Sequence, residues 1–287
     1  MTGNLAIVGG GRVGRALGAG LRAEGWRIGA VVTRHPATAR TAVRAIGGGS
    51  PFGVLTRQVL AADVVLLSTP DDSLAAVAAE LARMGGKEWR GKVVLHASGA
   101  LPAAVLAPLA ACGARTGSMH PMQTFGARGS ANLEGLRFAV EGDPGALRAA
   151  REIVRSLGGV PIRIDPRHKA AYHCAGSFAA GLALATLEAG TRLLEGTGFK
   201  RKQAVRALVS LSRQMIGNFE RLGPRAAWTG PLSRGDFSVV ARHVRVLRRQ
   251  PAEYLDAYAA LARLVIHLLA KSPRSARRRL DRALKAH

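Results

Sequence analysis

The sequence predicts an α/β domain with a mostly parallel sheet over residues 1–165, followed by an all-helical domain over residues 166–287. Short β-branched runs alternate with helical stretches in the first part, which is the pattern of a parallel sheet covered by helices. After Pro166 the sequence has no further β-rich run, and helical patterns follow one another. A chain of 287 residues with 48% hydrophobic residues is long and apolar enough for two buried cores.

The expected strands are short apolar runs that end in glycine or polar residues. They cover residues 4–9, 27–33, 63–69, 92–98, 114–120, 136–142 and 160–165, with a weaker candidate at 52–56. The helical patterns of the second part cover 167–196, 200–222, 235–249 and 251–270, separated by Gly- and Pro-containing stretches.

The chain carries a formal net charge of +24, from 42 basic and 18 acidic residues, which favours anionic ligands. Most of this excess is spread along the chain, and only residues 271–287 form a dense basic cluster. We interpret that cluster as a solvated tail or a terminal helix before any contact with a polyanion. Aromatic residues make up 5% of the chain and do not alternate with basic ones, which argues against nucleic-acid binding.

Several sequence features concern the location of the protein. Cys112 and Cys174 form no CxxC pair, which suits a reducing compartment, and the apolar N-terminus lacks the pattern of a signal peptide. The run 170–187 has the length of a membrane span, but Ala, Gly and Ser dominate it, which favours a helix buried in protein. We therefore expect a cytoplasmic protein without a membrane span. No group of side chains has convincing metal-ligand spacing.

A glycine motif follows the first strand. Gly9, Gly11 and Gly14 have the G-x-G-x-x-G spacing between an apolar strand and a helix. In the dinucleotide-binding Rossmann fold these glycines permit a tight turn, close approach of a pyrophosphate and close packing of the helix, whose N-terminus faces the phosphates. A glycine-rich turn without a ligand is the alternative. The expected cofactor loop is completed by the intervening residues Gly10, Arg12 and Val13.

The end of the second strand indicates which dinucleotide is bound. An NAD site places a carboxylate here, whereas this chain has Thr33 and Arg34, which suit the 2′-phosphate of NADP. Arg34 as an ordinary surface arginine is the alternative. Ser68, Thr69 and Pro70 follow a later strand and are also expected at the cofactor, with Asp71 and Asp72 as helix caps.

Polar residues at two further strand ends are candidates for the substrate. These are Ser98, Gly99, His120 and Gln123. His120 is a candidate for catalysis or for a structural hydrogen bond. His96 lies inside its strand and is expected to be a core histidine.

The first helix after Pro166 begins with Lys169 and His173, which are four residues apart and therefore share a face. Small residues follow on that face. We expect Lys169, with a lowered pKa in a partly dry cleft, to exchange the proton that accompanies hydride transfer, and His173 to orient the substrate. A lysine at the helix start beside a core histidine is the alternative.

A turn in the second domain, "TGPLSRGD", contains Arg234 and Asp236. Pro and Gly fix this turn, and Asp236 is a candidate helix cap. Arg234 is a candidate to bind the carboxylate of an anionic substrate. A solvated arginine and an ion pair are the alternatives.

These residues resemble the 6-phosphogluconate dehydrogenase-like superfamily, which includes β-hydroxyacid dehydrogenases, ketopantoate reductases and pyrroline-5-carboxylate reductases. Many hydroxyacid members have a catalytic lysine followed four residues later by asparagine; Lys169 matches the lysine, whereas His173 replaces the asparagine. Ser98, Gly99 and Ala100 stand near the position of their Ser-Gly-Gly substrate loop, with alanine in place of the second glycine. The motifs "HPMQTF", "KAAYHCAGSF" and "WTGPLSRGD" more closely resemble the bacterial proteins that carry domain of unknown function 2520. The resemblance implies an NADP-binding oxidoreductase.

Together the sequence favours an NADP-dependent dehydrogenase or reductase that acts on a small carboxylated carbonyl or imine compound. A non-catalytic NADP-binding sensor is the second hypothesis. We also expect a homodimer assembled through the helical domain, because a helix rich in Ala and Gly permits close packing and related reductases complete their sites across subunits.

Overall fold

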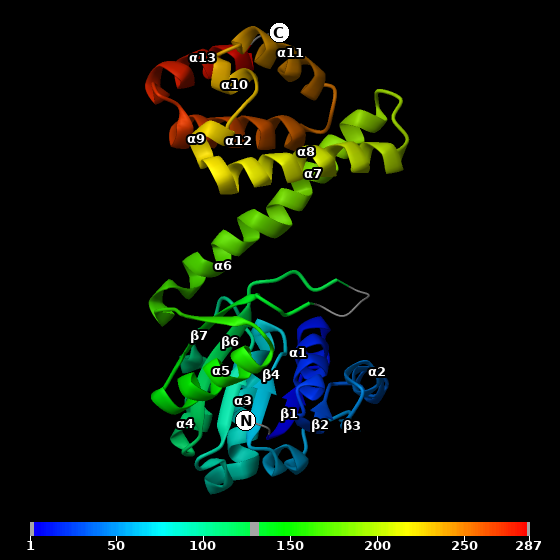
Figure 1. Ribbon diagram of the computed structural model, residues 1–287, viewed down its shortest axis with the longest axis vertical. Coiled ribbons are helices and arrows are strands. Elements are labelled where there is room, and N and C mark those ends of the chain that lie inside the picture. Colours follow the sequence, from blue (N-terminus) through cyan, green and yellow to red (C-terminus); the bar gives the residue numbers. More distant parts are fainter. Residues whose placement is uncertain (1–2, 127–131, 286–287) are drawn as a thin grey trace. The chain divides into compact units, whose positions relative to one another are not determined.

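The computed structural model describes residues 3–126 and 132–285 (Figure 1). The chain divides into two compact units, Met1–Ala180 and Gly181–His287. The sequence places the domain boundary earlier, at residue 165. We keep that boundary as a proposal, because the last strand ends at Arg163 and the helical part begins directly after it.

One sheet forms the centre of the first unit. Its strands are β1 (Asn4–Val8), β2 (Arg27–Val32), β3 (Ser50–Phe52), β4 (Val64–Leu67), β5 (Val93–His96), β6 (Arg115–Pro121), β7 (Arg137–Gly142) and β8 (Val160–Arg163). They lie in the order β3-β2-β1-β4-β5-β6-β7-β8. All neighbours are parallel except β6 and β7. The mostly parallel α/β domain expected from the sequence is therefore confirmed.

Helices cover both faces of this sheet (Figure 1). They are α1 (Arg12–Ala23), α2 (Pro36–Ile46), α3 (Asp71–Gly85), α4 (Ala107–Ala111) and α5 (Pro144–Ser156), with 3₁₀ turns at Arg57–Ala61, Gly86–Trp89 and Ala103–Leu106. Successive residues of a strand point to opposite faces, so Leu5 and Ile7 join one apolar cluster while Ala6 and Val8 join the other. Because both faces are buried, the strands are continuous apolar runs, which is why the sequence displays them clearly.

The outermost strand differs from its prediction. It covers Ser50–Phe52 rather than residues 52–56. Its partner β2 ends at Val32, which pairs with Phe52, so the following residues have no strand beside them. A Cβ on Gly53 would also lie 2.5 Å from Cγ of Pro36, because the chain turns closely against α2 there.

The second unit is all helical, as expected. It contains the helices α7 (Ala183–Glu195), α8 (Arg201–Leu222), α9 (Pro224–Ala227), α10 (Pro231–Arg234), α11 (Phe237–Leu247), α12 (Ala252–Leu269) and α13 (Pro273–Lys285). Its core includes Val240, Ile266 and Leu280. Because Leu280 and Ala283 are buried, the basic segment at the C-terminus is a packed helix and not a solvated tail.

The apolar segment Pro166–Glu195 is helical throughout. A 3₁₀ turn (Pro166–His168) leads into α6 (Lys169–Ser177), a π-helical stretch (Phe178–Leu182) and then α7. It is the single described helix long and apolar enough to cross a membrane, and none of its most apolar window is buried. The burial expected for this helix is not found within the chain: Phe178, Leu182 and Leu184 are all more than half exposed.

Candidate functional site

The glycine loop after β1 has the close contacts that its spacing predicts. Gly9 has a φ of 113°, and a Cβ there would lie 2.5 Å from the backbone of Ser68. A Cβ on Gly14 would lie 2.2 Å from the carbonyl oxygen of Gly9. Ser68 Oγ donates a 2.6 Å hydrogen bond to that same oxygen and fixes the loop against β4. Both glycines are therefore required by the fold itself.

Gly11 and its neighbours leave room for a ligand. A Cβ on Gly11 would meet nothing within 4 Å, and its φ of −71° is open to any residue. Gly11 is the N-cap of α1 and provides no side-chain cap, so the first amides of the helix face outward from the strand end. This open helix N-terminus, reached over small residues, fits a dinucleotide pyrophosphate. Val13 packs against the core, while exposed Arg12 donates from Nη1 to the carbonyl oxygen of Phe125 at 3.3 Å.

The residues expected around the ribose and the nicotinamide lie at the ends of β2 and β4. Thr33 Oγ1 donates to the carbonyl oxygen of His35 at 2.8 Å, and Arg34 is exposed beside it. Thr69 follows β4, and its buried Oγ1 has no hydrogen-bond partner in the described part of the chain. Pro70, not Asp71, is the N-cap of α3. The two aspartates expected as caps instead lie in its first turn, where negative charge is favourable.

Lys169 is the first residue of α6, and its side chain is buried. Its side chain is 1% exposed, and Nζ donates to Ser118 Oγ at 2.6 Å and to the carbonyl oxygen of Ser98 at 3.0 Å. Nζ also lies 3.5 Å from Oε1 of Glu141, whose side chain is 5% exposed. Burial lowers the pKa of Lys169, and the carboxylate of Glu141 opposes this shift.

Glu141 is the acceptor at the centre of this network. Its Oε1 accepts hydrogen bonds from Ser118 Oγ at 2.8 Å and from the backbone N–H of Ala103 at 2.7 Å. Glu141 lies on β7, opposite Ser118 on β6, because the two strands are paired in antiparallel register. Sequence reasoning missed this residue. An acidic side chain inside the apolar run "RFAVEG" was the available signal.

A second group lies on the same face of α6, one turn further along. Tyr172 and His173 follow Lys169 by three and four residues. The hydroxyl of Tyr172 is 2.8 Å from Nδ1 of His120, and the rings of His120 and His173 meet edge to face at 6.1 Å. A Cβ on Gly99 would lie 2.8 Å from atoms of both histidines, so glycine is needed between them. The structure thus brings together the candidates Ser98, Gly99, His120, Lys169 and His173.

The two central groups of this cluster titrate far from neutral pH. Burial lowers the pKa of His120 to about 4, and the charge of Lys169 contributes to the shift. Burial raises the pKa of Tyr172 to about 12. At neutral pH the imidazole is therefore uncharged and the phenol holds its proton. Sequence reasoning also missed Tyr172: it lies within the motif "KAAYHCAGSF" but was assigned no role, and its contact with His120 identifies it.

The remaining candidates have separate environments. His96 is fully buried, its Nδ1 accepts from the N–H of Ser98 at 3.2 Å, and burial lowers its pKa to about 3, as suits a core histidine. Gln123 is exposed, and its Oε1 accepts from the N–H of Thr124. Arg234 belongs to the second unit, where its Nε forms a 2.9 Å ion pair with Asp236. Asp236 is the N-cap of α11, but its side chain forms no cap hydrogen bond.

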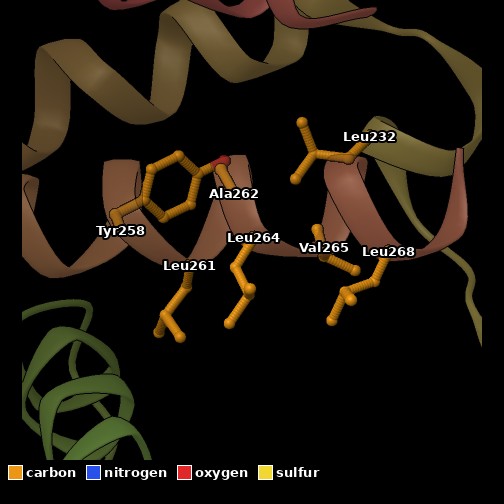
Figure 2. Close-up of a pocket in the computed structure, with 7 residues that line it drawn as sticks. All are labelled: Leu232, Tyr258, Leu261, Ala262, Leu264, Val265 and Leu268. Atoms are coloured by element: carbon orange, nitrogen blue, oxygen red, sulfur yellow. The ribbon is translucent and has the colours of Figure 1, made fainter. Parts of the chain in front are cut away.

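Other regions of the described structure have fewer groups suited to binding a metal ion or activating a substrate. Among residues 3–126 and 132–285 no group of His, Cys, Asp or Glu could hold a metal ion. A groove on α12 is lined mainly by apolar side chains: Leu261, Leu264 and Leu268 line it together with Leu232, Tyr258, Ala262 and Val265 (Figure 2). Such a groove can bury an apolar partner, and the hydroxyl of Tyr258 beside it is paired with Nδ1 of His243 at 3.0 Å. The polar cluster at the strand ends is therefore the candidate active site.

Two models of known domains match the chain. Residues 3–121 match the model of the Rossmann-like domain, and residues 136–265 match that of the domain of unknown function DUF2520. The chain therefore carries a Rossmann-like domain followed by a DUF2520 domain, as its motifs indicate. Among curated proteins no significant sequence match was found.

Solved structures with the same fold cover almost the whole chain. A reductive aminase from Aspergillus terreus, in complex with NADPH and ethyl-5-oxohexanoate, has a TM-score of 0.70 at 20% identity and covers 96% of this chain and 98% of its own. An imine reductase from Streptomyces aurantiacus has a TM-score of 0.67 at 17% identity, with coverage of 95% and 98%. A pyrroline-5-carboxylate reductase from Coxiella burnetii has a TM-score of 0.58 at 18% identity, with coverage of 94% and 99%.

Proposed function

We propose that the protein is an NADP-dependent oxidoreductase that reduces a small carboxylated carbonyl or imine compound. This proposal rests on one observation: the glycine loop and the polar cluster lie at the same edge of the sheet. β1, β4, β5 and β6 are parallel, so their carboxyl ends lie at one edge, with the open helix N-terminus at one end and Ser98, His120 and Tyr172 at the other. In this fold, ligands bind outside the carboxyl ends of the strands.

The cofactor assignment is supported by the fit of the loop. The residues that would hold NADPH are Gly9, Gly10, Gly11 and Gly14 at the pyrophosphate and Thr33 and Arg34 at the ribose 2′-phosphate. Ser68, Thr69 and Pro70 would lie toward the nicotinamide, which supplies a hydride to a carbonyl or imine carbon when bound. The solved aminase complex with NADPH supports the same choice.

Within the polar cluster we propose distinct roles. His120 takes part in proton transfer to the substrate, and exposed His173 borders the substrate. Ser98, Gly99 and Gln123 form the neighbouring substrate wall. Lys169, expected from the sequence to exchange the proton, is enclosed, and we propose that it holds the start of α6 on the strand ends.

We also propose Arg234 as a contact for the substrate carboxylate. Its Nε is engaged by Asp236, whereas its terminal nitrogens have no hydrogen bond in the described part of the chain. A guanidinium held in this way keeps a free edge for a carboxylate, and the net positive charge of the chain favours an anionic substrate. The free thiols Cys112 and Cys174 suit a cytoplasmic location.

The reaction is tested by adding purified protein and NADPH to a panel of 2-keto acids, ketones with amines, and cyclic imines. Loss of NADPH absorbance that depends on one of these compounds supports the proposal. Tight NADPH binding with no turnover on the whole panel would contradict it and favour the sensor hypothesis.

NADPH is expected to bind at least about tenfold more tightly than NADH, because a charged hydrogen bond to a 2′-phosphate contributes about 1.5–3 kcal/mol. Arg34→Ala should remove this preference and leave NADH affinity nearly unchanged. Calorimetric titration of both cofactors measures the effect. The control is Arg40→Ala, which changes another exposed arginine, on α2. Equal affinities of the unmodified protein for both cofactors would contradict the assignment.

A homodimer is expected, because several large apolar side chains of the second unit are exposed. Leu211, Ile216 and Phe219 on α8 are each more than half exposed, and the apolar groove of Figure 2 lies on α12. Surfaces of this kind mark interaction sites. We propose that a second copy covers them. Light scattering should give about twice the chain mass of 30.0 kDa, and a value near 30.0 kDa at micromolar concentration would contradict it.

A further inference from the structure

We infer that Tyr172 is the proton donor of the proposed reduction, with His120 as the group that returns the proton to it. The inference rests on the proposed function and assigns the acid within that site. It differs from the role that the sequence pattern suggests for Lys169, and three observations support it.

The first observation is that the protons of Lys169 are already committed. An ammonium group has three donors. Nζ is within 2.6 Å of Ser118 Oγ, 3.0 Å of the Ser98 carbonyl oxygen and 3.5 Å of Glu141 Oε1. With a side chain that is only 1% exposed, Lys169 has no donor directed toward space that a substrate can enter.

The second observation is the position of Tyr172. It lies three residues after Lys169, so its side chain leaves the same face of α6 one turn further from the buried network. It is half-buried, whereas Lys169 is buried. Its hydroxyl lies at the end of β6, 2.8 Å from Nδ1 of His120, beside the Ser98–Gly99 turn that the histidine rings contact.

The third observation concerns protonation. At neutral pH the phenol of Tyr172 holds its proton, as any phenol does, and burial lowers the pKa of His120 so that its imidazole is neutral. We assign the proton of this neutral imidazole to Nδ1, so that Nδ1 donates to the phenol oxygen. The phenol hydrogen then points away from His120 and is free for a substrate.

The proton balance follows from this geometry. Hydride addition to the carbon of a C=O or C=N bond breaks the π bond and leaves an electron pair on oxygen or nitrogen. That atom takes the proton of Tyr172, the phenolate takes the Nδ1 proton of His120, and Nε2 of the ring takes a proton from water, which leaves hydroxide in the solvent. Exchange of the ring protons with solvent returns His120 to the Nδ1-protonated form before the next turnover. The sum is one hydride from NADPH and one proton from solvent for each double bond reduced.

The test uses two kinds of substrate with Tyr172→Phe, which removes one oxygen and keeps the ring. A carbonyl compound needs a proton, whereas an N-methylated cyclic iminium ion accepts hydride and needs none. For the carbonyl compound we expect kcat to fall by about 10²–10⁴-fold, the usual contribution of a positioned acid. For the iminium ion we expect kcat within a few-fold of the unmodified protein, and NADPH affinity should be unchanged.

Tyr258→Phe is the matched control, because Tyr258 in the second unit forms the same kind of bond, 3.0 Å to Nδ1 of His243. It should leave both rates unchanged. An equal loss of both rates in Tyr172→Phe would assign Tyr172 a structural role, and full activity on the carbonyl compound would remove it from the site. Either result overturns the inference about Tyr172 and leaves the proposed function standing. An unmodified protein that reduces neither compound with NADPH contradicts the proposed function itself.

Discussion

Lys169→Met is expected to lower the free energy of unfolding by about 3–5 kcal/mol, which is the usual cost of breaking a buried ion pair by removing one partner. The substitution leaves the Glu141 carboxylate, 5% exposed, with only Ser118 and the Ala103 N–H as hydrogen-bond donors. A buried charge with no opposite charge beside it is strongly unfavourable. Urea unfolding of the variant and of the unmodified protein measures the difference.

The double variant Lys169→Met/Glu141→Gln is the matched control. It removes both charges together, and we expect it to regain a large part of the lost stability. Glu141→Gln alone should also destabilise the protein, because it leaves the ammonium group of Lys169 uncompensated. If Lys169→Met instead keeps full stability and loses only turnover, Lys169 is a proton donor and not a positioning residue.

Gly11→Val is expected to weaken NADPH binding by about 10–100-fold, equivalent to roughly 1.4–2.7 kcal/mol. The added side chain would occupy the space in front of the α1 N-terminus, where the structure places no atom within 4 Å of a Cβ. The fold should not change, because the φ of −71° is suitable for any residue. Calorimetric titration measures the affinity, and thermal unfolding without cofactor measures the stability.

Gly181→Val provides the control, because a Cβ there also meets nothing within 4 Å and the residue lies outside the first unit. It should leave NADPH affinity unchanged. A Gly11→Val protein that binds NADPH as tightly as the unmodified protein would place the pyrophosphate somewhere other than this loop. A large loss of thermal stability would show that Gly11 is instead required for folding.

The order of strands and helices could be predicted from the sequence because each rests on local patterns. Buried parallel strands are continuous apolar runs, and the change after Pro166 from β-branched runs to helical periodicity marks the start of the helical part. The glycine loop was equally accessible, because Gly9 and Gly14 are required by contacts within one strand–turn–helix segment. The edge strand β3 was misplaced because its limits are set by where β2 ends, not by its own residues.

The candidate site could be predicted only in part from the sequence, because its decisive contacts join residues that are distant along the chain. Sequence alone determined that Lys169 and His173 share a helix face and that Ser98 and His120 follow strands. Only the tertiary structure decided that Glu141 lies beneath Lys169, through the antiparallel pairing of β6 and β7, and that Tyr172 meets His120. Spacing along one helix or strand fixes which side chains lie together locally. Which groups from different elements come within hydrogen-bond distance, and which are thereby buried, depends on how the elements pack.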